Sequence, residues 1–110
     1  MAKAVRISAS GEVADTPITV SLGELDDVIW IAAGTGGPWT IVFDDDISGQ
    51  GTYPIANGSP FSESTYAIAK GGSVGSTGGP VNGQVGSTYR YKVKDGSGNI
   101  KGEGEIDVDT

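Results

Sequence analysis

The chain contains neither histidine nor cysteine among its 110 residues. Without cysteine it has no disulfides, no thiolate nucleophile and no iron–sulfur or tetrathiolate zinc site. Without histidine it has no imidazole base, no Ser-His-Asp triad and none of the copper and catalytic zinc sites that use imidazole. The lack of cysteine leaves the compartment open, because a reducing cytosol and a secreted domain without disulfides both fit.

Basic residues and long hydrophobic runs are also scarce. The net charge is −7, and no Lys or Arg occurs between Ile7 and Ala69, which argues against nucleic acid and anionic membrane surfaces as partners. The longest apolar run, Val28 to Ala33, is far shorter than the ~20 residues of a membrane helix, so we expect no membrane insertion. The first residues lack the hydrophobic segment of a signal peptide. We expect a soluble protein, either cytoplasmic or a secreted domain whose signal has been removed.

Short β-branched and aromatic runs alternate with turn residues along the whole chain, and no segment has the apolar spacing of an amphipathic helix. The 19 glycines lack the period of collagen. We expect strands at residues 3–8, 17–22, 27–33, 39–44, 65–70, 87–94 and 101–109. This length suits one domain. Residues 1–110 are therefore predicted to form a single all-β domain, a seven- to eight-stranded Greek-key β-sandwich.

Two long connections interrupt this pattern. Residues 45–64 carry Tyr53 and Phe61, and their aromatics predict that this connection packs back on the sandwich. Residues 71–86 are rich in glycine and are predicted to form a flexible or irregular edge, with a partner-binding loop as the alternative. They lack the Gly-Lys-Ser/Thr of a nucleotide-binding loop.

The last two predicted strands fix their own register. Aromatic and basic residues alternate from Tyr89 to Lys94, and acidic residues alternate from Glu103 to Asp109. Opposite charges across two strands stabilise a pair by about 0.2–1 kcal/mol. We predict that the opposed pairs are Lys92–Glu103, Arg90–Glu105, Tyr89–Ile106 and Tyr91–Gly104. The basic stripe is then a feature of this hairpin rather than a nucleic-acid patch.

Four segments resemble the plastocyanin-type cupredoxins. Residues 37–46 (GPWTIVFDDD) are similar to the family's Pro-His-Asn-Val/Ile-Val-Phe-Asp strand, and residues 23–30 (GELDDVIW) to its Gly-Asp-x-Val-x-Trp segment. Residues 86–93 (GSTYRYKV) resemble its Gly-x-Tyr-x-Phe/Tyr-x-Cys strand, and residues 106–108 its closing strand. The resemblance implies a cupredoxin-like sandwich. An immunoglobulin-like sandwich is the alternative, because the two folds share this strand patterning.

The copper ligands of that family are missing at each matching position. Trp39 stands where the family has its first histidine, and Val93 or a neighbour where it has cysteine. No histidine occurs from Asp95 to Asn99, and the single methionine is Met1. Type 1 copper requires a thiolate and two imidazoles. We therefore expect no cofactor and no electron-transfer function.

The remaining candidate site residues are acidic and aromatic. The run Asp44, Asp45 and Asp46 has calcium-type oxygen ligands, but a solvated acidic loop is the preferred interpretation, and no metal site is predicted. Tyr53, Phe61 and Tyr66 are candidates for exposed aromatic contacts. No pattern brings together two carboxylates or a Ser–Lys pair, so an enzyme is not expected.

These features predict a non-catalytic binding or interaction module. Its ligand, an unknown protein or a small molecule, would bind through Asp44–Asp46, Tyr53, Phe61 and the glycine-rich residues 71–86. The alternative is a structural subunit that self-assembles or decorates a larger assembly through its sheet edges, and hence a possible homo-oligomer. Residues 65–86 have few charged side chains to block an open edge.

Overall fold

The computed structural model describes residues 2–43, 51–76 and 78–110, and in these ranges it is all-β, with no helix long and apolar enough to cross a membrane. All seven predicted strands are present, each end within two residues of its predicted position. The strands are β1 (Ala2–Ile7), β2 (Ile18–Ser21), β3 (Asp27–Ala32), β4 (Trp39–Phe43), β5 (Ile55–Ala56), β6 (Thr65–Ile68), β7 (Ser73–Gly75), β8 (Ser87–Lys94) and β9 (Ile100–Asp109).

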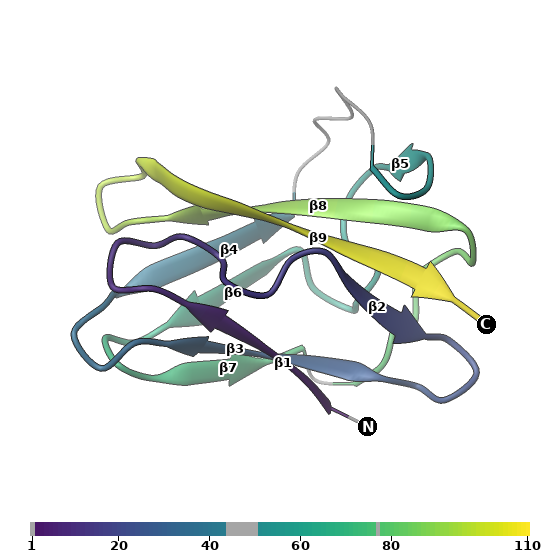
Figure 1. Cartoon of the computed structure of the whole chain (residues 1–110), viewed down its shortest axis with the longest axis horizontal. Helices are drawn as coiled ribbons and strands as arrows, with labels where there is room; N and C mark the ends of the chain where they lie inside the picture. Colours follow the sequence, from purple (N-terminus) through teal and green to yellow (C-terminus); the bar gives the residue numbers. More distant parts are fainter. Residues whose placement is uncertain (1, 44–50, 77) are drawn as a thin grey trace.

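Two sheets form a sandwich (Figure 1). One has the order β1-β3-β7, and the other β2-β9-β8-β4-β6 with β5 added to β8. Strand β1 runs parallel to β3, and β2 runs parallel to β9. The other main pairings are antiparallel. The chain therefore passes between the two sheets after β1, β2, β3, β6 and β7.

Alternating side chains of both sheets meet in one core. Trp30 lies at its centre, with the rings of Tyr66, Tyr91, Phe43 and Phe61 at centroid distances of 5.1, 5.7, 6.1 and 6.2 Å. Three of these pairs are edge-on and the Trp30–Tyr66 pair is tilted, which suits the charge distribution of aromatic rings. Aliphatic residues complete the core: Val5, Ile7, Val20, Val28, Ile41, Ile68, Val93, Ile106 and Val108.

The β8–β9 hairpin has the predicted register. All four predicted pairs occur, with Tyr91 opposite Gly104 and Arg90 opposite Glu105. The Arg90 Nε donates to Glu105 Oε1 at 2.8 Å. Not every acidic residue of β9 is exposed to solvent, however. Asp107 is buried, and its carboxylate accepts a hydrogen bond from the Thr88 hydroxyl, because β5 lies along β8 at Thr88.

The two long connections differ in how well they were predicted. The described part of the 45–64 connection packs on the sandwich as expected, since it supplies β5 and the buried Phe61. Residues 71–86 lie at a sheet edge as expected, but they are less irregular than predicted. They contain β7, whose Val74 opposes Trp30 of β3, and Ser76, whose side chain is fully buried. Glycine disfavours the strand conformation, but here the hydrogen bonds to β3 stabilise it.

A covering segment protects the outer edge of β1. Val13 forms a bridge with Ile7, and the Ala14 amide donates to the Arg6 carbonyl. Asp15 then accepts from the Arg6 amide at 2.9 Å and from the guanidinium Nε and Nη2 at 2.9 and 2.8 Å. The bidentate pair fixes this segment on the edge of the sheet.

We expect this pair to make stability depend on pH below about 4. Hydrogen bonds from the Arg6 side chain, and then from its amide, lower the pKa of Asp15 to about 2. Because the unfolded carboxyl has its ordinary pKa, the unfolded state binds more protons in this range, and the stabilisation present at neutral pH is lost as pH falls from about 4 towards 2.

Urea unfolding at a series of pH values checks this. The wild type should lose more stability than Asp15→Asn across that window, and the two should converge near pH 2. Parallel curves for the two proteins would contradict the assignment to Asp15.

Candidate functional site

Of the single residues predicted to bind, the structure describes Tyr53 and Phe61. Asp44, Asp45 and Asp46 lie outside the described residues. Tyr53 is half-buried, with its amide donating to Thr88 Oγ1 at 2.9 Å. The expectation of exposed aromatic contacts is wrong for Phe61 and Tyr66, which are 1% and 3% exposed. Both rings are part of the aromatic cluster around Trp30, where burial is more favourable than exposure on a loop.

A different surface forms where the β2–β3 turn and the glycine-rich segment meet. The turn is built by Ser21 and Asp26. The Ser21 amide donates to Asp26 Oδ2 at 3.0 Å, and the Asp26 amide donates to the Ser21 carbonyl at 3.1 Å. The Ser21 amide is the main cause that lowers the pKa of the Asp26 carboxyl. These contacts hold the turn rigidly against the end of the sandwich.

Leu25 stands out within this turn. It is the one non-glycine residue with positive φ (54°) in the described part of the chain, although Gly23 nearby has the freer backbone. The left-handed conformation costs an L-residue about 1–2 kcal/mol. The Leu25 side chain is also 63% exposed, so packing in the core does not offset this cost.

The glycine-rich segment packs directly on the turn. A Cβ at Gly79 would lie 2.9 Å from Cα and C of Leu25, so only glycine fits there. Asn82 ties the segment to the preceding loop, because its amide donates to the Pro60 carbonyl and its side chain to the Phe61 carbonyl, both at 2.9 Å. The segment is thus anchored and presents its remaining side chains in a defined place.

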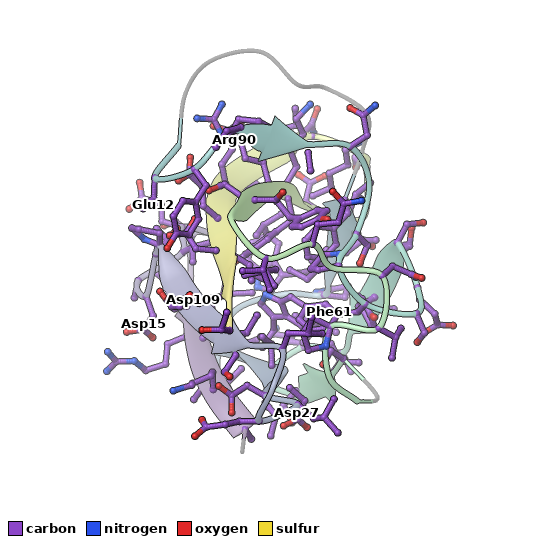
Figure 2. All side chains as sticks on the ribbon, turned by 90° about the vertical axis from the view of Figure 1, so that its right-hand side faces the viewer. Glu12, Asp15, Asp27, Phe61, Arg90 and Asp109 are labelled. Atoms are coloured by element: carbon purple, nitrogen blue, oxygen red, sulfur yellow. The ribbon has the colours of Figure 1, made fainter. Side chains whose placement is uncertain are left out.

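Exposed apolar side chains come from both loops. Leu25, Val81 and Val85 are 63%, 64% and 46% exposed, and we call these three residues the loop-end surface. The β2–β3 turn and the segment between β7 and β8 lie at the right-hand end of Figure 1, which faces the viewer in Figure 2, where Asp27 and Asp109 lie at the same end. Exposed apolar side chains with carboxylates at the same end of the sandwich are suited to a partner that offers apolar and basic groups.

Other parts of the described chain provide weaker sites. No three of its Asp and Glu side chains gather closely enough to hold a metal ion. Asp95 closes the β8–β9 turn, since its Oδ1 accepts from the amides of Ser97 and Asn99 at 2.9 Å each, which lowers its pKa. A groove of about 400 Å³ lies beside Arg6, Ala14, Ile31 and Ala33, but its walls are mainly apolar and supply few polar groups to orient a ligand.

Only part of the loop-end surface could be predicted from the sequence. The glycine-rich segment was a candidate, and the structure packs it on the β2–β3 turn. Leu25 was missed because a leucine two residues after Gly23 gives no indication that the positive φ falls on the leucine. In comparisons with known proteins, no family model matches the chain, and no curated protein matches it significantly.

Proposed function

We propose that this protein is a non-catalytic interaction module with a cupredoxin-like fold and no type 1 copper site. The sheet orders support the fold type, because β1 joins the sheet of β3 and β7 while β2 joins the last strand, β9. The parallel pairs β1–β3 and β2–β9 fit the same arrangement. Function has to come from surfaces, since one fold serves many activities.

Two of the positions that match the family's copper ligands hold apolar side chains. Trp39 and Val93 are both buried, on the neighbouring strands β4 and β8. A Cβ at Gly11 would lie 3.2 Å from two ring carbons of Trp39, so the indole fills the space beneath this loop. Neither side chain offers copper a ligand.

The observation that carries the proposal is the exposed Leu25 at positive φ. A residue that is both strained and exposed is better explained by contact with a partner than by stability. The partner class that fits is a protein surface with apolar and basic side chains, because the loop-end surface is apolar and carboxylates lie at the same end of the sandwich.

We expect Leu25→Asn to stabilise the protein while weakening partner binding. Asparagine tolerates the left-handed conformation, so the free energy of unfolding should rise by about 1 kcal/mol. Loss of an apolar anchor should weaken binding about tenfold or more. A photoreactive analogue of leucine at position 25, which keeps the apolar side chain, identifies the partner in cells that make the protein, and calorimetry then compares wild type and variant.

The matched control is position 100. Ile100 is 52% exposed but lies on the β8–β9 hairpin, away from the loop-end surface. Ile100→Asn should leave partner binding unchanged. Equal binding by wild type and Leu25→Asn would reject the loop-end surface as the binding site.

A second candidate function is assembly through sheet edges, as a structural subunit. The observation that favours it is the pair of edge strands β6 and β7. Each ends its own sheet, and they lie side by side, with the Tyr66 hydroxyl donating to the Ser76 carbonyl at 3.2 Å. Neither strand contains a charged residue, and charge is the usual protection of an edge.

A further inference from the structure

Strand β6 has a row of backbone hydrogen-bonding groups that no other described strand uses. The Phe43 amide donates to the Ser64 carbonyl at 2.8 Å, so residues 43 and 64 are a hydrogen-bonded pair of the antiparallel β4–β6 ladder. Such pairs alternate along the ladder, which makes 41–66 and 39–68 the next two. The amides and carbonyls of Thr65 and Ala67 therefore point away from β4. Among the described residues, no strand pairs with that side of β6.

The two ends of β6 carry opposite charges. Glu63 precedes the strand and Lys70 follows it, both exposed, while the four residues of β6 are uncharged. Within the described part of the chain neither side chain forms an ion pair. The edge of β1 is different, since residues 13–15 cover it and the Arg6–Asp15 pair fastens them.

We propose that two copies of this chain pair antiparallel through their β6 edges and form a continuous sheet across a two-fold axis. In this arrangement Glu63 of each copy lies beside Lys70 of the other. If the two β6 strands paired in parallel, Glu63 would instead lie beside Glu63 of the other copy, and Lys70 beside Lys70. This inference rests on the edge-assembly candidate above and is independent of the loop-end surface.

The inward and outward faces of β6 also match in such a dimer. Tyr66 and Ile68 are buried, whereas Thr65 and Ala67 are exposed. Directly opposite residues of antiparallel strands share a face. An axis at Tyr66 or at Ala67 therefore keeps the buried side chains of both copies on the core side, and either axis places Glu63 within one residue of the partner's Lys70.

The first test measures amide hydrogen exchange and sedimentation equilibrium over a wide range of protein concentrations. The dimer should form as concentration rises, and exchange at Thr65 and Ala67 should then slow at least tenfold. The amides of Tyr66 and Ile68, which face β4, serve as the internal control and should be protected throughout.

The second test uses three variants of the full chain. Ala67→Pro removes an outward amide that β4 does not use, so the fold should survive while the dimer is lost. Lys70→Glu should weaken the dimer about tenfold, because two attractive contacts become repulsive. Adding Glu63→Lys to it should restore wild-type affinity. Lys101→Glu makes the same change in net charge away from β6 and should have no effect.

Each contrary result has a distinct meaning. A monomer at every concentration overturns the proposed dimer, and fast exchange at Thr65 and Ala67 in that monomer would leave the edge open to a different strand. Slow exchange at those amides in a monomer would overturn the edge-assembly candidate as well, because the chain would then cover its own edge. The antiparallel β6 contact is overturned if the Ala67→Pro variant still forms the dimer. It is also overturned if adding Glu63→Lys to Lys70→Glu does not restore the wild-type dimer affinity.

Discussion

Replacing Gly104 by alanine is expected to lower the free energy of unfolding by about 3 kcal/mol or more, the upper part of the range for overpacked cores. A Cβ at this position would overlap Cζ and Oη of Tyr91. The two residues are directly opposite in the β8–β9 ladder, and Tyr91 is buried. The hydrogen bonds of the ladder keep the strands from separating, and the aromatic cluster keeps the ring from turning away.

Urea unfolding followed by circular dichroism measures this loss, with a fall in the thermal midpoint of roughly 10 °C. Gly96→Ala is the matched control, since Gly96 lies in the turn of the same hairpin with no neighbour within 4 Å and no positive φ. Its effect should stay within about 0.5 kcal/mol. In a Tyr91→Val background the cost of Gly104→Ala should shrink by about 1 kcal/mol or more, and an unchanged cost would refute the overlap.

The opposition of a large and a small residue was visible in the sequence because a strand has a period of two. Once Arg90 is set opposite Glu105, the position of Tyr91 opposite Gly104 follows without further information, and the structure has that register. The seven strands found from sequence share this property, since each alternates over several residues. The alternation of residues along a strand is sufficient to predict that strand where the side chains on one face are buried and those on the other are not.

The parts that were missed depend on contacts between distant segments. Strand β7 contains only one residue of high strand preference, Val74, between Ser73 and Gly75, and it forms because β3 supplies partners. Phe61 resembled a loop aromatic, yet the cluster around Trp30 takes it into the core. Leu25 adopts a positive φ because the Ser21–Asp26 contacts close the turn around it. Local sequence contains none of this information.

Removing the Trp30 side chain should have the second large effect on stability. Trp30 is fully buried and is in ring contact with Phe43, Phe61, Tyr66 and Tyr91. Truncation of a buried tryptophan to alanine costs about 3–5 kcal/mol, through lost burial and the cavity left behind. The total stability of a domain of this size is about 5–15 kcal/mol, so Trp30→Ala should leave little or no folded margin.

Trp30→Phe keeps a ring in the cluster and should lower the free energy of unfolding by only about 1–2 kcal/mol, because part of the edge-on contacts and of the buried area is lost. Ile31→Ala is the control on the same strand, because Ile31 faces outward beside Trp30 and is partly exposed. Its cost should stay near 0.5 kcal/mol. Chemical denaturation of the three variants orders them as Trp30→Ala, Trp30→Phe and Ile31→Ala from least to most stable. If Ile31→Ala cost as much as Trp30→Ala, both faces of β3 would have to be buried, and the outer face of the three-stranded sheet would then be covered by a partner even in the purified protein.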